Sequence, residues 1–417
     1  MQSKRLIFQT ATKVIDIFVR DNAMDTQNSP IHIGLWHRSF WMLALVGLFL
    51  TMSVYVQMVS IPYLGKTYFA SSDIVGLAFG TYGIGLFALG AFCSYLVKSR
   101  CRHLVCKEAI LVVAALYVLM WLMFKNAGLF SQGGLAVGML AMRFLLGAFF
   151  GLAEMVLAST LVIDSCESFY RTEANYSAAW LRRFALSLGP VVGMLVVFKF
   201  NILDTFLVSA VLAVLAFVFL SVVHFSFRAP EEDAHVMSFD RFFLSHGAML
   251  FFNFLLTTIA VGLLFSLSHS ETFYALLMGG FLVALLAEKF AFANADLKSE
   301  NISGFLCIGA SILIMYLRHG LTHLWISAFL LGLGVGLVSS RTLLFLIKLS
   351  RHCERGTSQS TFFLLWEGGL AVGLFVSFYF LQASREQVLL LALCLVVLSL
   401  IIYNFFTHSW YVRNKNR

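Results

Sequence analysis

Charge is scarce in this sequence. Only 12% of the residues are charged, whereas 60% are hydrophobic, and a soluble domain averages about 25% charged residues. Because so little charge cannot cover a surface that faces water, lipid is the solvent that fits. Proline is scarce as well, at 4 of 417 residues, which favours long uninterrupted helices. We therefore expect an integral membrane protein.

The sequence also lacks the signatures of secretion, metal binding and catalysis. The first long apolar run begins near Phe40 and is too long for the apolar part of a cleaved signal. Cys101, His103 and Cys106 are not followed by a fourth metal ligand, so we expect no metal. We find no Gly-x-Ser-x-Gly, no His-Glu-x-x-His and no phosphate-binding loop, and so we expect no enzyme.

Apolar runs of the length that crosses a membrane are abundant. A helix needs about 20 apolar residues to span the hydrocarbon core. Twelve runs meet this criterion: Phe40–Tyr63, Ser72–Val97, Val105–Phe124, Leu135–Ile163, Tyr176–Phe198, Thr205–Phe227, Phe243–Leu267, Thr272–Phe292, Ser299–Leu317, Leu321–Ile347, Gln359–Leu381 and Glu386–Phe406. The sequence thus predicts an all-α polytopic membrane protein with twelve transmembrane helices.

The positions of these runs divide the chain into five segments. They are a leader (1–39), an N-terminal six-helix bundle (40–227), a polar linker (228–242), a C-terminal six-helix bundle (243–406) and a tail (407–417). The leader has an apolar pattern over Lys4–Arg20 that is consistent with an interfacial helix. Met24 is an alternative start, in which case residues 1–23 do not belong to the native protein.

Basic residues indicate the orientation. With both termini in the cytoplasm, the outer loops carry only five of the 29 Lys and Arg residues: Lys66, Lys125, Lys199, Arg318 and Arg385. This asymmetry follows the positive-inside rule, so the net charge of +8 needs no nucleic-acid partner. We expect a multi-pass protein of the bacterial cytoplasmic (inner) membrane, surrounded by lipid and monomeric.

An internal repeat supports two homologous halves. The motif Phe-Leu-Leu-Gly-x-x-x-Gly-Leu begins at Phe144 and recurs, 185 positions later, at Phe329. Small residues at every fourth position let membrane helices approach closely, and such pairs occur in spans two, four, five, ten and eleven. Spans three, six and twelve contain no glycine, which places them on the periphery. Parallel six-helix repeats are a transporter architecture.

The twelve spans from Phe40 to Phe406 resemble the major facilitator superfamily, and two segments carry motifs like those of the family. Arg143–Gly151 resembles that family's fourth-helix motif, in which a membrane-embedded arginine precedes spaced glycines. Gly189-Pro190 with Gly193 resembles the fifth-helix motif of its antiporters. The loop after span two differs from the family pattern, because Ser94 occupies the usual aspartate position. The chain is also similar to uncharacterised Bacteroidetes-type members. The resemblance implies the superfamily's fold, alternating access, and a gating role for Gly189, Pro190 and Gly193.

Buried ionisable residues are the candidates for the transport mechanism, since each costs several kcal/mol in hydrocarbon unless it is paired or hydrated. Arg143 and Glu154 share one face of span four, roughly 16 Å apart. Arg143 is a candidate for substrate anchoring or proton-linked control, or else a brace held by backbone carbonyls. Arg182 and Arg341 lie nearer the predicted cytoplasmic ends, where snorkelling explains them.

Glu154 and Glu367 are the candidate proton sites. A carboxyl group can be neutral while it is buried and can release its proton once it is rehydrated. The alternative for both is an ion pair that closes the cytoplasmic gate, with Arg183 as the partner. Gln57 and Asn253 add uncharged polar groups that could bind substrate.

These observations predict a secondary active transporter of a small organic molecule. Abundant phenylalanine, at 43 residues, favours an amphipathic or apolar cargo over a highly charged one. We expect no cofactor other than a proton as coupling ion, with efflux by antiport as the direction that Gly189-Pro190 indicates. The alternatives are a nutrient importer, by proton symport or facilitated diffusion, and a membrane sensor or enzyme that transports nothing.

Overall fold

The structure is a computed structural model that describes residues 35–69, 71–167, 170–225, 235–267, 270–292, 295–318 and 320–415. Most of the predicted leader, including Met24, and residues 228–234 of the predicted linker lie outside the described residues.

Twelve membrane-length helices are present among the described residues, and the predicted fold class is confirmed. In the N-terminal half these spans are Arg38–Phe69, Ser72–Ser99, Arg102–Lys125, Gln132–Asp164, Arg171–Lys199 and Asp204–Val222. In the C-terminal half they are Ser245–Phe265, Glu271–Phe290, Leu297–Leu317, Leu321–Leu349, Arg355–Tyr379 and Arg385–Asn414.

Short breaks divide several of these spans. The labelled elements of the first half are α2 (Arg38–Tyr55), α3 (Gln57–Leu64), α4 (Ser72–Ala88), α5 (Cys93–Ser99), α6 (Arg102–Lys125), α7 (Gln132–Val156), α8 (Val162–Asp164), α9 (Arg171–Lys199) and α10 (Asp204–Val222). Those of the second half are α11 (Ala248–Phe265), α12 (Glu271–Phe290), α13 (Leu297–Leu317), α14 (Leu321–Leu349), α15 (Arg355–Tyr379), α16 (Arg385–Ile402) and α17 (His408–Asn414).

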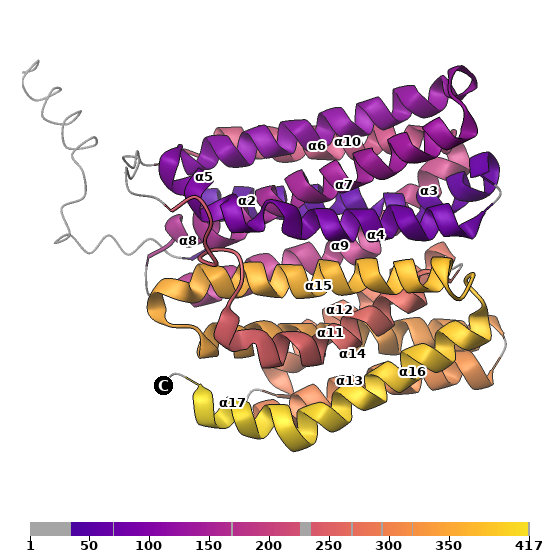
Figure 1. Cartoon of the computed structure of the whole chain (residues 1–417). Helices are drawn as coiled ribbons and strands as arrows, with labels where there is room; N and C mark the ends of the chain where they lie inside the picture. The colour runs from indigo at the N-terminus through magenta and orange to yellow at the C-terminus, as the bar shows by residue number, and fades with distance from the viewer. Residues whose placement is uncertain are drawn as a thin grey trace, which may run out of the picture. The chain divides into compact units, whose positions relative to one another are not determined.

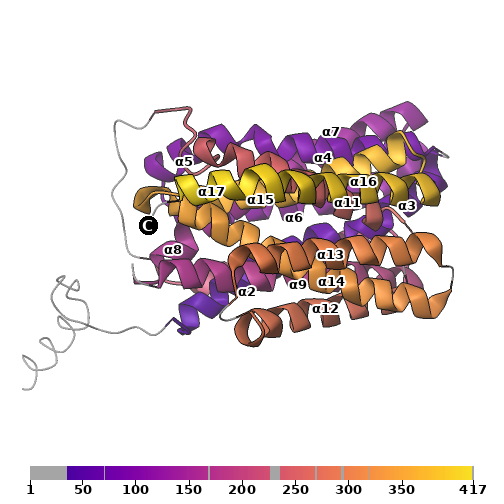
Figure 2. The same cartoon turned by 90° about the horizontal axis from the view of Figure 1, so that it is seen from below.

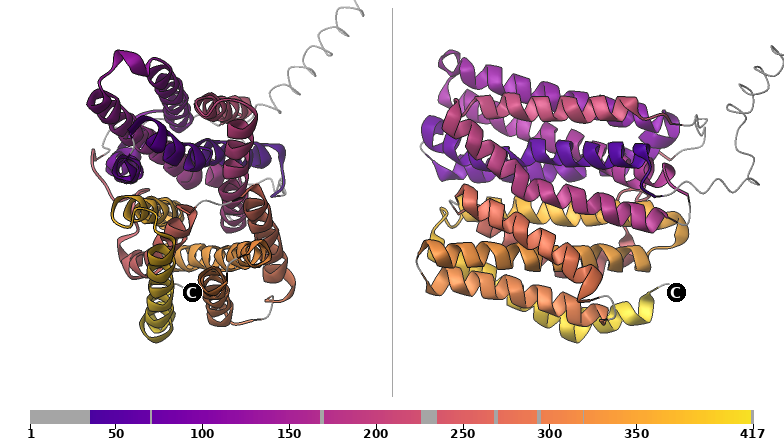
Figure 3. Two further views of the ribbon diagram at one scale, coloured as in Figure 1. Left: turned by 90° about the vertical axis from the view of Figure 1, so that its right-hand side faces the viewer. Right: turned by 180° about the vertical axis from the view of Figure 1, so that it is seen from behind.

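The two halves lie side by side, with their helices running along one common direction (Figures 1 and 2). The view along the helices shows the two groups separately (Figure 3). We call the end that carries the connections 99–102, 165–170 and 350–354 and the C-terminus the basic end; it lies on the left in Figure 1. The other end, with the connections 65–72, 125–132, 199–204, 318–321 and 380–385, is the opposite end.

The repeated glycine motif performs the same packing in both halves. A Cβ added at Gly147 of α7 would lie 2.2 Å from the carbonyl oxygen of Tyr82 on α4. A Cβ added at Gly332 of α14 would lie 2.2 Å from the carbonyl oxygen of Leu277 on α12. Because real Cβ contacts are never that short, glycine at both positions allows the second and fourth helices of each half to touch through their backbones.

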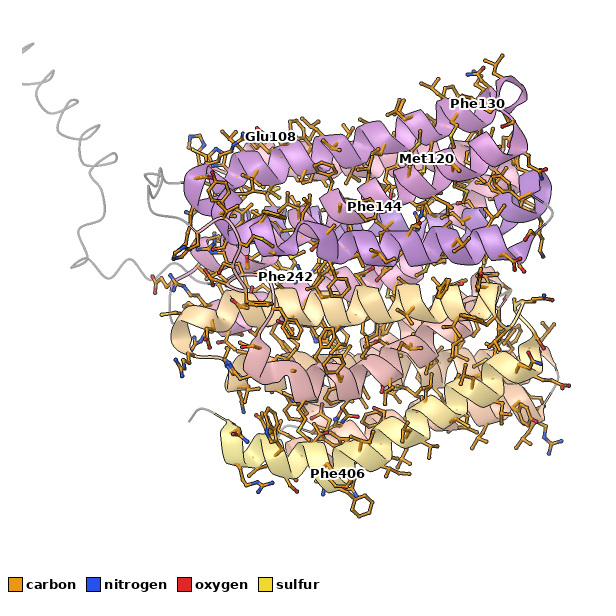
Figure 4. All side chains as sticks on the ribbon, viewed as in Figure 1. Glu108, Met120, Phe130, Phe144, Phe242 and Phe406 are labelled. Atoms are coloured by element: carbon orange, nitrogen blue, oxygen red, sulfur yellow. The ribbon has the colours of Figure 1, made fainter. Side chains whose placement is uncertain are left out.

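Lipid is the expected solvent of the outer surface. The helices that were predicted to be peripheral carry stripes of exposed apolar side chains: Leu111, Val118, Leu119 and Leu122 on α6; Val211, Val214 and Val218 on α10; Leu390, Val397, Leu398 and Ile401 on α16. Phe406, beyond α16, is 62% exposed and projects away from the bundle (Figure 4). Such contiguous exposed apolar surface is compatible with lipid and not with water.

Candidate functional site

A small cavity of about 40 Å³ lies between the two halves. The first half lines it with Thr51, Tyr55, Ala179, Arg182 and Arg183, and the second half with Phe362, Phe363, Trp366 and Glu367. Arg183 and Glu367 each stand twelve residues after the first residue of their helices α9 and α15, which is about 18 Å along each helix at 1.5 Å per residue. The cavity is therefore close to the middle of the spans.

Glu367 connects the two halves through its carboxylate. The hydroxyl of Tyr55 on α2 donates a hydrogen bond to its Oε1. The hydroxyl of Tyr82 on α4 donates to its Oε2 at 3.2 Å. Glu367 is 3% exposed, and both donors belong to the first half. Hydrogen bonds to a charged group are stronger than neutral ones, so the two bonds to this carboxylate hold the halves together most strongly when Glu367 is ionised.

Glu154 is held inside the first half. Its Oε2 lies 3.1 Å from Nη1 of Arg182 on α9, and Thr51 on α2 donates to its Oε1 at 3.2 Å. The alternative in which Glu154 forms an ion pair holds with a different partner, because the cation beside Glu154 is Arg182 and not Arg183. The snorkelling prediction for Arg182 is wrong because of this pairing.

Arg341 also has a buried partner. Its Nη2 lies 2.5 Å from Oε2 of Glu300 on α13, and the two side chains are only 12% and 0% exposed. The guanidinium therefore has a buried carboxylate partner in the first turn of α13, which the snorkelling explanation for Arg341 did not include.

Arg183 differs from these paired arginines. It is 4% exposed, and its Nε, Nη1 and Nη2 have no hydrogen-bond partner among the described residues. Its guanidinium carbon lies 4.6 Å from the ring centre of Trp180 and 5.7 Å from that of Phe362. Two aromatic faces therefore flank a buried cation whose polar groups remain free to bind.

Arg143 stands apart from the cavity lining. It is 1% exposed, and its Nε donates to the carbonyl oxygen of Ala78 at 3.4 Å. Its guanidinium carbon lies 4.8 Å from the ring centre of Tyr82 and 5.6 Å from that of Phe79. These contacts are those of a brace between α7 and α4, and through Tyr82 the brace positions one of the two donors to Glu367.

Gln57 and Asn253 are committed to packing within their own halves. The Nε2 of Gln57 donates to the carbonyl oxygen of Thr205 at 3.1 Å and to Ser209 at 2.8 Å. The Nδ2 of Asn253 donates to Thr407 at 3.0 Å, and Ser399 donates to its Oδ1 at 3.1 Å. Since neither amide lines the cavity, the structure does not place them where a substrate would bind.

Gly189, Pro190 and Gly193 pack within the first half. A Cβ added at Gly189 would lie 2.6 Å from Cβ of Tyr55, and one at Gly193 would lie 2.7 Å from the carbonyl oxygen of Val56. The helix α9 continues through Pro190. The two glycines therefore hold α9 against the break between α2 and α3, which positions Tyr55.

The halves meet closely at the basic end. Glu288 on α12 accepts hydrogen bonds from Tyr176 on α9 and from Ser340 on α14. A Cβ added at Gly356 at the start of α15 would lie 2.5 Å from the carbonyl oxygen of Ser159. The two halves are therefore in backbone contact at Gly356, which closes the basic end.

A carboxylate also stands beside Ser94, the position where the family pattern has aspartate. It belongs to Asp240, which accepts from Ser94 at 3.1 Å and from Thr357 at 3.4 Å. Phe242, labelled in Figure 4, follows it and packs on Gly90, where an added Cβ would lie 2.0 Å from the Phe242 ring. The segment before α11 therefore joins the end of the second span to the start of α15.

The opposite end contains a larger recess of about 670 Å³ between the halves. Its walls include Pro62, Lys66 and Val75 from the first half and Ser266, Phe378 and Arg385 from the second. Phe378 stacks on Phe79 with ring centres 6.0 Å apart, and it lies on α15 between Glu367 and that end. Closure at the basic end with a recess at the opposite end is one of the states that alternating access requires.

Comparison with known proteins identifies this architecture. No family model and no curated protein matches the sequence. Among solved structures, the human organic anion transporter MFSD10 has 14% identity and a TM-score of 0.64, covering 87% of this chain and 99% of its own. A bacterial homologue of the iron transporter ferroportin in an outward-facing state has 15% identity and a TM-score of 0.63, covering 89% and 100%. The nucleoside transporter NupG has 13% identity and a TM-score of 0.62, covering 88% and 99%.

The chain has the major facilitator fold. At this level of identity the likeness concerns the fold alone, and the cargo named for each neighbour belongs to that neighbour.

Proposed function

We propose that the protein is a proton-coupled secondary transporter of a small organic molecule that works by alternating access. The observation that carries the proposal is the buried carboxylate of Glu367, which stands in a cavity between two six-helix halves and binds hydroxyls of the opposite half. Solved structures with this fold include transporters of organic anions, nucleosides and peptides, which supports transport over sensing or catalysis.

Glu367 is the proposed proton site. When it is ionised, Tyr55 and Tyr82 donate charge-assisted bonds to it and hold α15 against α2 and α4. Protonation removes the charge and weakens both bonds, which favours separation of the halves. Proton binding thereby drives the change in access. Glu154 has a cation at 3.1 Å, so we assign it to positioning α9 instead.

The basic end is proposed to face the cytoplasm of a bacterial inner membrane, with the protein acting as a monomer. Arg100, Arg102 and Arg351 stand in its connections, and cytoplasmic loops carry the excess of Lys and Arg. In that orientation the recess opens to the outside. Labelling of single cysteines at Lys98 and Lys125 with an impermeant thiol reagent tests the assignment: intact cells should label only the second site.

The direction of transport is the remaining part of the proposal. Export by antiport rests on the resemblance of Gly189-Pro190 to an antiporter motif, and that segment packs inside the first half. Import by proton symport is the second candidate, and a specific observation favours it: the unpaired cation Arg183 stands beside Glu367 in one cavity. An anionic ligand on Arg183 would add negative charge to the cavity that Glu367 lines and so favour protonation of Glu367, and ligand and proton would then move together.

A substrate screen under a proton gradient tests the proposal. Purified protein is reconstituted in liposomes with an imposed pH difference, and a panel of organic anions, cations and neutral solutes is offered to wild type and to Glu367→Gln. We expect at least one class to accumulate against its gradient in wild type and not in Glu367→Gln. Equal accumulation in both would contradict the assignment of Glu367, and no movement of any solute would contradict transport.

A further inference from the structure

We propose that Arg183 is the anchor of an anion site, and that the cargo is an amphipathic organic carboxylate that binds together with a proton. This inference deepens the proposed function and rests on it. It begins from the polar groups of Arg183: all three guanidinium nitrogens are buried and have no hydrogen-bond partner among the described residues. A guanidinium cannot deprotonate to escape this cost, so the missing partner must come from elsewhere.

Neighbouring carboxylates do not supply that partner. The Glu154 carboxylate is bound by Arg182 and Thr51. Glu288 accepts from Tyr176 and Ser340. The Glu367 oxygens accept from two tyrosine hydroxyls, and among the described residues none of these carboxylates forms an ion pair with Arg183. The cation therefore remains available to a ligand.

The surroundings of Arg183 define the chemistry of that ligand. The planar guanidinium matches a carboxylate through two parallel hydrogen bonds. Trp366, Phe362 and Phe363 line the same cavity and offer apolar and aromatic surface to the rest of the molecule. At about 40 Å³ the closed cavity has room for little more than a carboxylate group, so the apolar body must be accommodated as the halves separate.

The coupling between ligand binding at Arg183 and proton binding at Glu367 follows from the groups that face Glu367. On α2 and α4 these are the neutral hydroxyls of Tyr55 and Tyr82. On α7 and α9 they are Glu154 and Arg182, whose opposite charges lie 3.1 Å apart and largely cancel.

Two further cations, Arg143 and Arg183, lie near the groups that face Glu367. Arg143 stacks on the ring of Tyr82, which donates to Glu367. Arg183 is the cavity-lining cation whose nitrogens have no hydrogen-bond partner among the described residues. An anion on Arg183 adds a negative charge to the cavity that Glu367 also lines, and this charge favours protonation of Glu367.

Binding of matched ligands to the purified full-length protein tests the anion site. The probes are phenylacetate, phenylacetamide and phenethylamine, together with octanoate, octanamide and octylamine. We expect a carboxylate of either set to bind wild type at least tenfold more tightly than its amide and amine. Arg183→Gln should lose this preference, and Arg183→Lys should retain part of it, since lysine keeps the charge but not the paired donors. If neither carboxylate exceeds its amide, or if Arg183→Gln keeps the preference, the anion site is refuted.

Proton uptake tests whether ligand binding and protonation of Glu367 are coupled, independently of the test of the anion site. In weakly buffered detergent solution at neutral pH, binding of the carboxylate should remove protons from solution in wild type and not in Glu367→Gln. Preferred carboxylate binding without uptake would leave the site in place and overturn this coupling. Transport in liposomes separates the two proposals. If amines or amides move and carboxylates do not, the protein is a transporter but the anion site is not its substrate site. If carboxylates bind and no probe moves, the anion site stands and the proposal of transport is overturned.

Discussion

Arg182 and Arg183 are neighbours in sequence, and the structure predicts that their removal has opposite effects on stability. Arg182 pairs with Glu154 at 3.1 Å, and the two side chains are 14% and 0% exposed. Replacing Arg182 with glutamine leaves a buried carboxylate without its cation. Replacing Arg183 with glutamine removes a buried cation that has no partner among the described residues, so it should stabilise the empty protein or leave it unchanged.

The size of the effect follows from the burial of the pair. Breaking a buried ion pair by removing one partner costs about 3 to 5 kcal/mol. The unfolding entropy of a 417-residue chain is roughly 0.9 kcal/mol/K at about 2.1 cal/mol/K per residue. Arg182→Gln should therefore lower the midpoint of thermal unfolding by about 3 to 6 °C, and the midpoint of Arg183→Gln should be equal to or above that of wild type.

A thiol-reactive fluorogenic dye provides the assay. Cys93, Cys106 and Cys166 are buried, so they react only as the detergent-solubilised protein unfolds. Arg341→Gln, which breaks the pair with Glu300 in the other half, is the matched control and should behave as Arg182→Gln does. If Arg183→Gln lowers the midpoint as much as Arg182→Gln, Arg183 has a structural partner and the reasoning is refuted.

Four further substitutions test the latch, formed by the hydrogen bonds of Tyr55 and Tyr82 to Glu367, and the closed end. Tyr55→Phe or Tyr82→Phe removes a donor to Glu367. Spin labels across the basic end, at Lys98→Cys and Arg351→Cys, should therefore report about tenfold more of the state in which that end is open, with Tyr63→Phe as control. An unchanged distance distribution would argue against the latch. Gly356→Val should slow transport, because its Cβ would lie 2.5 Å from the carbonyl oxygen of Ser159, whereas Gly309→Val, where nothing lies within 4 Å, should not. Asp240→Asn should speed thiol labelling of the buried Cys93, whereas Asp73→Asn should not. If Cys93 is labelled at the same rate in Asp240→Asn and in wild type, Asp240 does not help to close the basic end.

The sequence predicted the spans well because the length of an apolar run is set by the membrane. It predicted the ends of the helices less well. The fifth helix begins at Arg171 and not at Tyr176, since a helix can continue through polar residues beyond the apolar run. This extension moves Arg183 from the predicted gate to the middle of the span, about 18 Å from the helix start.

The cavity itself was predicted only in part. Glu367 was recognised because a carboxylate in an apolar span is conspicuous, whereas Tyr55 and Tyr82 were missed. A tyrosine counts as apolar in a hydropathy pattern, and its role depends on the register between helices of different halves. Arg182 and Arg183 illustrate the same limit: adjacent residues point about 100° apart on a helix, so one faces Glu154 and the other the cavity, which no spacing along the sequence reveals.

The most direct test of the central claim compares exchange with accumulation in Glu367→Gln. Liposomes containing the wild-type protein should both exchange labelled for unlabelled substrate and concentrate the substrate under a proton gradient. With Glu367→Gln we predict that exchange persists while gradient-driven concentration and the accompanying proton flux are lost. If Glu367→Gln still concentrates substrate as the wild type does, the proton does not act through this carboxylate and the proposed coupling is wrong.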